Sequence, residues 1–256
     1  PTDPFARTPQ YKRMGWGFKL GYGSGKHFID LYFLRAYDCL NSIDENAQNL
    51  VSPQENIVVG LKGQVTPFKW LAFSANVATS VFNKDSRAAK VPIKTSFDKI
   101  FDVNYSSLMR FAGDLSANIM LPGVNANISY RMVQPDYTSL GVSYITNNYQ
   151  SLGVNAGTHL GRLSLNGNLT AQSDNLDGKQ LYTTRGYVYS ANASLPFDFG
   201  LNLTAGYNGY LQKQYDGMAI VPDSSRIHRS TSSYSFTPSY EFTTTNTNNN
   251  ISLSAN

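Results

Sequence analysis

Apolar and polar residues alternate along most of this chain with a period of two residues. The clearest segment is 124–132, where the odd positions are polar and the even positions are Val124, Ala126, Ile128, Tyr130 and Met132. Because successive side chains of a β-strand point to opposite faces, such a segment has one apolar and one polar face. The same alternation occurs at 15–22, 57–65, 71–78, 163–172 and 201–208. No segment of comparable length has a helical period, so the pattern predicts an all-β chain.

The connections between these segments follow a second pattern, in which short and long ones alternate. Short turns rich in Gly, Pro and Asn are expected at 23–26, 66–69, 122–123, 161–162, 196–200 and 246–249. Longer polar connections are expected at 38–55, 83–107, 134–148, 174–184 and 213–229. Outer-membrane barrels have this arrangement, with short periplasmic turns and longer extracellular loops. The expected strands of about 9–12 residues match the roughly 9–11 of a membrane strand, whereas soluble strands average about 5–6.

These patterns predict an antiparallel up-and-down transmembrane β-barrel, with about twelve strands in this chain. Residues 1–256 are assigned to one outer-membrane barrel domain. If the short turns are periplasmic, residues 1–14 lie on the extracellular side, whereas complete bacterial barrels usually have both termini in the periplasm. The last expected strand begins near Asn250 and stops after few residues. We therefore expect the domain to be incomplete at both ends and to belong to a larger barrel.

The composition narrows the classes of function. Charged residues make up 15% of the chain, against about 25% in typical soluble domains. The net charge of +4 is spread thinly, without a cluster of Lys and Arg, so no nucleic-acid partner is expected. Cys39 is the single cysteine, and no histidines are spaced as a metal pair, so neither a metal nor a cofactor is expected. No apolar run reaches the roughly 18 residues of a membrane helix, so strands would have to contact the outer-membrane lipid.

Four stretches of the sequence resemble a family of large, mostly uncharacterised outer-membrane barrels from Bacteroidetes. They are FIDLYFLRAYDCLNSI (Phe28–Ile43), VSPQENIVVGLKGQVTPFKWLAFSANVATSVFNKD (Val51–Asp85), GDLSANIMLPGVNANISYRMVQPDYTSLG (Gly113–Gly141) and GRLSLNGNLTAQSDNLDG (Gly161–Gly178). The resemblance covers about two-thirds of the chain and contains no catalytic signature. It implies a closed barrel in the outer membrane of a diderm bacterium, and it assigns no functional residues.

Four charged residues lie on the polar side of their expected strands, namely Lys19, Lys62, Asp114 and Arg131. A charge on the lipid face costs about 2–4 kcal/mol at the midplane of the bilayer, so these side chains are expected to line the lumen. There they either border a pathway for solutes or form structural ion pairs across a filled lumen, and the sequence does not separate these alternatives.

One arrangement of residues resembles that of a barrel-embedded hydrolase, because His159 shares the polar face with Asn155 and Ser164. Alternation alone produces Asn and Ser throughout this chain, so we expect a lumen or turn histidine and no enzyme activity.

The leading hypothesis is therefore a passive channel or transport protein with a mildly basic lumen lined by Lys19, Lys62 and Arg131. The alternative is a plugged, non-conducting barrel that docks outer-membrane or surface proteins through its long loops. A third hypothesis is a soluble or secreted β-protein whose sequence only imitates the barrel pattern.

Overall fold

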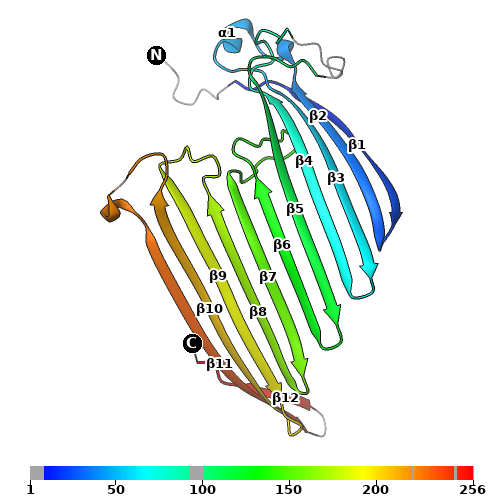
Figure 1. Cartoon of the computed structure of the whole chain (residues 1–256), viewed down its shortest axis with the longest axis vertical. Helices are drawn as coiled ribbons and strands as arrows, with labels where there is room; N and C mark the ends of the chain where they lie inside the picture. Colours follow the sequence, from blue (N-terminus) through cyan, green and yellow to red (C-terminus); the bar gives the residue numbers. More distant parts are fainter. Residues whose placement is uncertain (1–8, 93–100, 221, 245–246, 256) are drawn as a thin grey trace. The chain divides into compact units, whose positions relative to one another are not determined.

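The computed structural model describes residues 9–92, 101–220, 222–244 and 247–255. These residues form one twelve-stranded sheet whose strand order follows the chain from β1 to β12 (Figure 1). The strands are β1 (Arg13–Ser24), β2 (His27–Asp38), β3 (Glu55–Phe68), β4 (Leu71–Asn83), β5 (Ser107–Leu121), β6 (Val124–Val133), β7 (Tyr149–Leu160), β8 (Leu163–Asp174), β9 (Tyr182–Pro196), β10 (Leu201–Asp216), β11 (His228–Thr244) and β12 (Thr247–Ser252). The prediction of an all-β, antiparallel up-and-down fold with about twelve strands is confirmed.

The alternation of short and long connections is also present. Two residues join β1 to β2, β3 to β4, β5 to β6 and β7 to β8, and four join β9 to β10. Gly123 and Gly161 have φ values of +77° and +62°, which is why glycine stands in these tight turns. The turn expected at 246–249 was wrong for residues 247–249, which belong to β12 and pair with β11, while residue 246 lies outside the described residues. Part of the connection at 83–107 also lies outside them.

Two of the long connections are shorter than predicted by at least four residues. Strand β8 continues to Asp174 and β9 begins at Tyr182, while β10 continues to Asp216 and β11 begins at His228. The strand ends are rich in Gln, Thr and Ser, which resemble loop residues when only the sequence is read. They belong to the ladder because Gln212 and Gln214 pair with residues of β9.

The contacts within the chain divide it into two compact units. The first comprises Pro1–Gly63, Asn76–Gly113 and Val133–Asn147, and the second comprises Gln64–Ala75, Asp114–Met132 and Asn148–Asn256. Strands β3 to β6 contribute residues to both units, so the division follows contacts and does not separate two consecutive stretches of chain. No helix in the described part of the chain has the length and apolar character needed to cross a membrane.

In the first unit, one face of the β1–β2 hairpin is apolar and open to its surroundings. The register pairs Phe18 with Phe33 and Leu20 with Leu31. The rings of Phe18 and Phe33 stack with their centroids 5.4 Å apart, and Leu20 remains 62% exposed. The opposite face of the hairpin carries Lys19 and Asp30, so the expected separation into two faces is present here.

The second unit shows the same separation over more strands. Register partners share a face, and one row of partners across β7, β8 and β9 is Val154, Leu169 and Tyr189. Leu169 is 50% exposed. The next row on the other face is Asn155, Asn168 and Ser190. The large apolar side chains of these strands therefore lie on an exposed surface and not in a buried core.

The buried apolar side chains among the described residues are few. They are Ala36, Ile57, Val58, Ala72, Phe82, Phe101, Val133 and Tyr137. All of these except Ala72 belong to the first unit. Apolar burial is thus concentrated where the long loops of the first unit meet the strand ends.

Candidate functional site

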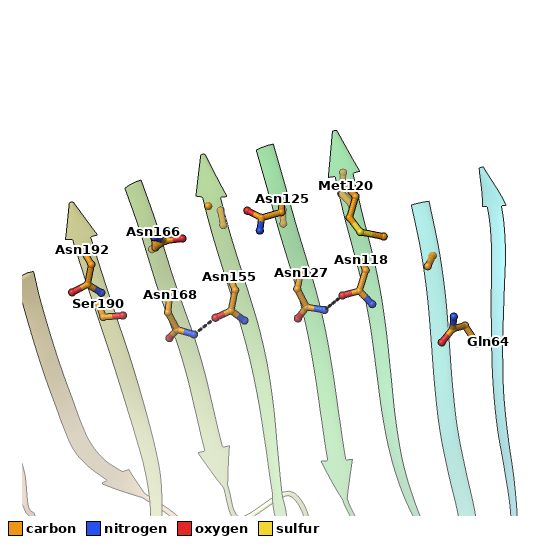
Figure 2. Close-up of a pocket in the computed structure, with 16 residues that line it drawn as sticks. Gln64, Asn118, Met120, Asn125, Asn127, Asn155, Asn166, Asn168, Ser190 and Asn192 are labelled. Atoms are coloured by element: carbon orange, nitrogen blue, oxygen red, sulfur yellow. Dashed lines mark hydrogen bonds between the residues drawn. The ribbon is translucent and has the colours of Figure 1, made fainter. Parts of the chain in front are cut away.

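A belt of amide side chains crosses the polar face of the second unit (Figure 2). Strands β5 to β9 supply most of it, because the registers of β7, β8 and β9 bring their polar positions side by side and Asn127 of β6 bonds to Asn118 of β5. A hollow of about 580 Å³ lies over this belt. We define the amide belt as Gln64, Asn118, Asn125, Asn127, Asn155, Asn166, Asn168 and Asn192.

Two pairs of amides in the belt are hydrogen-bonded across neighbouring strands. Asn127 Nδ2 donates to Asn118 Oδ1 at 2.6 Å, and Asn168 Nδ2 donates to Asn155 Oδ1. An asparagine amide has two N–H donors and an oxygen with two lone pairs. One lateral bond therefore orients each side chain and leaves further donors and acceptors for water or a polar solute.

The structure brings two of the four predicted charged residues together. Arg131 Nε lies 3.3 Å from Asp114 Oδ1, and the guanidinium of Arg131 lies over the ring of Tyr149, 5.9 Å from its centroid. Asp114 and Arg131 are about half exposed, so their ion pair is a weak contribution to stability but cancels charge locally.

Lys19 also has a partner, which the sequence analysis missed. Its Nζ lies 2.8 Å from Oδ2 of Asp30, whose side chain is only 14% exposed. Asp30 could have been found from the sequence, because a hairpin centred on the turn at 23–26 brings the two residues to the same face at diagonal positions.

Lys62 lies on the polar face of the first unit. Gly60, two residues before Lys62 in β3, identifies this face. A Cβ built on Gly60 would collide with the ring of Tyr32, and the Tyr32 hydroxyl donates to Asn76 Oδ1 at 2.9 Å. Lys62 is exposed, and within the described ranges no ion pair involves it. Three of the four predicted charges are therefore in ion pairs, and Lys62 has no such partner among the residues that the structure describes.

The histidine that resembled part of a hydrolase contacts one of the residues considered with it. His159 Nδ1 lies 2.8 Å from Ser164 Oγ, because the two residues are register partners beside a two-residue turn. Asn155 is instead hydrogen-bonded to Asn168. Both His159 and the bond are exposed, and no described residue orients the other ring nitrogen as a catalytic base requires. The absence of enzyme activity stays a prediction.

The long loops of the first unit are joined by a second group of polar contacts. Arg87 donates to the carboxylate of Asp85 and, through Nη1, to the carbonyl oxygen of Gln48 at 2.9 Å. The hydrogen bond from Arg87 lowers the pKa of Asp85 below its ordinary value, and the same bond raises the pKa of Arg87. No group of three or more His, Cys, Asp or Glu side chains among the described residues is arranged to hold a metal ion.

Comparison with known proteins adds no relative to this description. A scan against protein-family models found no match, and searches of curated proteins and of solved structures found none either.

Proposed function

We propose that this chain forms part of the wall of a bacterial outer-membrane β-barrel that acts as a passive channel for polar solutes. The observation that supports the proposal most strongly is the separation of each unit into an exposed apolar face and a polar face. A soluble protein would lose stability by leaving so many large apolar side chains in water, whereas lipid is their natural surroundings. The resemblance to outer-membrane barrels of Bacteroidetes supports the same location.

The aromatic residues near the short turns of the second unit support a membrane boundary. Ring pairs occur at Phe68 and Trp70, with centroids 5.4 Å apart, and at Phe197 and Phe199, with the same separation. Tyr240 and Phe242 form a third ring pair near the end of β11, with centroids 6.0 Å apart. Aromatic girdles of this kind lie at the level of the lipid headgroups in outer-membrane barrels.

The polar face then corresponds to the lumen, and its chemistry indicates the class of solute. The amide belt is neutral, and Lys19, Asp114 and Arg131 are held in ion pairs. A wall of this kind offers hydrogen bonds but produces no strong electrostatic field. Uncharged polar molecules are therefore the solutes that fit it best. Lys62 gives the lumen a weak preference for anions.

The first prediction concerns the conductance of the full-length protein in a planar bilayer. We expect stable open steps with a weak anion preference, and we expect Lys62→Gln to reduce that preference because it removes a positive charge that the proposed function assigns to the lumen. Lys213→Gln is the matched control, because Lys213 lies on the apolar face and is exposed. A reversal potential that shifts equally in both variants, or in neither, would contradict the assignment of Lys62 to the lumen.

The alternative function, a plugged barrel that docks partners through its loops, is favoured by one specific observation. The loops of the first unit are ordered by buried contacts, including Asn104, which is 3% exposed and donates from Nδ2 to the carbonyl oxygen of Asp85 at 3.0 Å. Such a fixed surface suits a partner protein. A barrel that resists denaturation in detergent but conducts no ions would favour this alternative over the channel.

A further inference from the structure

The loop that joins β6 to β7 lies on the polar face of β3 and β4. The backbone N–H of Leu140 donates to Asn56 Oδ1 at 3.1 Å. The carbonyl oxygen of Thr138 accepts from Ser80 Oγ at 2.5 Å and from Asn56 Nδ2 at 3.5 Å. Asn56 and Ser80 belong to the same face as Gly60 and Asn76, since each lies an even number of residues from one of them.

These contacts are buried, whereas most of the polar face is open. Asn56 is 0% exposed, Ser80 is 1% exposed and Tyr137 is 5% exposed. Burial raises the pKa of the Tyr137 hydroxyl, which agrees with a side chain enclosed by protein. Val58 and Phe82 are also buried, and they lie on the same face as Asn56 and Ser80, since each is two residues from one of them. The loop therefore covers one end of β3 and β4 on the face that the proposed function assigns to the lumen.

Asn56 links the loop to β4 through the two ends of its amide. Its oxygen accepts from Leu140, while its nitrogen lies within hydrogen-bond distance of Ser80 Oγ at 2.7 Å and of the carbonyl oxygen of Val81 at 3.0 Å. A fully buried amide whose donor and acceptor are both hydrogen-bonded holds its neighbours more firmly than an exposed one. When its bonds break, no water replaces them, and the unsatisfied polar groups cost free energy.

The start of the same loop has an anchor of its own. Arg110 Nε donates to the carbonyl oxygen of Pro135 at 2.8 Å. Asp136 follows with a φ of +57°, a left-handed conformation that turns the chain at this point. Asn147 Nδ2 donates back to the carbonyl oxygen of Tyr137 at 3.2 Å, which ties the two ends of the loop together. The loop is thus held at both ends and in its middle.

We propose that residues 135–142 form a constriction loop inside the channel and that Asn56 is the residue that positions it. This inference rests on the proposed channel and adds the element that limits its width. The size of the permeating solutes is then set by the constriction loop, while the amide belt provides hydrogen bonds along the wall.

The test starts with an intramolecular cross-link. A Cβ built on Gly141 would lie 3.6 Å from Leu34 Cγ and in contact with Leu34 Cδ2. Leu34 lies on the polar face of β2, because it is two residues from Tyr32. With Cys39→Ser as background, Leu34→Cys plus Gly141→Cys should form a disulfide in the folded protein. The matched control is Leu31→Cys plus Gly141→Cys, because Leu31 lies on the opposite face of the same strand and should not form one.

The second step measures single-channel conductance in the cross-linkable protein. Asn56→Ala should raise the conductance about twofold or more after reduction, because the loop is then free to leave the lumen, and should leave it low while the disulfide is intact. Ser80→Ala provides a milder release of the same loop if Asn56→Ala fails to fold. Asn46→Ala, in the exposed helix α1 (Glu45–Gln48), should leave the conductance unchanged.

The possible outcomes separate this inference from the proposed function. Conductance without the Leu34–Gly141 cross-link would overturn the constriction loop and leave the channel standing. A cross-link with conductance that neither Asn56→Ala nor Ser80→Ala changes would overturn the role of the loop as a constriction. A cross-link without conductance in any variant would overturn the channel, and with it the constriction, in favour of a plugged barrel.

Discussion

Replacing Leu169 with arginine is expected to impair membrane assembly, while replacing Asn166 with arginine is expected to be tolerated. Both residues are exposed and belong to β8, but they lie on opposite faces. If the apolar face meets lipid, Leu169→Arg moves a charge into hydrocarbon near the middle of the strand, at a cost of about 2–4 kcal/mol. Asn166→Arg moves the same charge into the polar hollow over the amide belt.

The measurement is the fraction of full-length protein that resists unfolding by detergent before heating, as seen by its altered migration in a gel. The two variants share the strand, the new side chain, the change in net charge and the exposed position, so a large difference in assembly between them reports the face on which the charge lies. Equal assembly of the two variants would contradict the membrane location, and with it the channel.

The features that the sequence predicted well depend on local periodicity. The alternation in 124–132 and 163–172 directly reports the two faces of β6 and β8, and the glycines at 123 and 161 report turns that few other residues can form. The strand ends were predicted less well. Polar residues such as Gln214 do not alternate with apolar residues there, so the sequence does not show that they pair with the neighbouring strand.

The features that the sequence did not predict depend on contacts between distant segments. Leu140 and Asn56 are separated by 84 residues, and no periodicity connects a loop carbonyl or N–H to a particular strand amide. The expected loop at 134–148 was correct in position, but its packing on the polar face followed only from the structure. Conversely, the pairing of Lys19 with Asp30 lies within one hairpin and could have been inferred from its register.

A second result with a large expected effect concerns two glycines on the apolar face of the second unit. Tyr189 is the register partner of Gly209, and its ring lies over that glycine so closely that a Cβ would overlap it. The ring also contacts Tyr207, whose centroid is 5.7 Å away, and Tyr207 in turn lies 4.8 Å from Tyr234. Gly209 thus provides the space in which a row of three tyrosines crosses β9, β10 and β11.

Gly209→Ala should therefore destabilise the protein by about 1–3 kcal/mol, because the ring of Tyr189 must leave its position and lose its contact with Tyr207. Gly167→Ala is the matched control on the same face, since a Cβ there would have its nearest neighbour, the carbonyl oxygen of Ser190, at 3.7 Å. This second substitution should stabilise the protein by about 0.5–1 kcal/mol, because alanine loses less backbone freedom than glycine on folding.

Urea unfolding of the full-length protein, folded into lipid vesicles, measures both effects as shifts of the midpoint in opposite directions. Tyrosine fluorescence and gel migration should report the same transition for each variant. If both alanines stabilise the protein equally, the ring of Tyr189 does not occupy the space above Gly209, and the row of tyrosines would have to be rejected. If both destabilise it, glycine is needed in these strands for their backbone and not for the space it leaves.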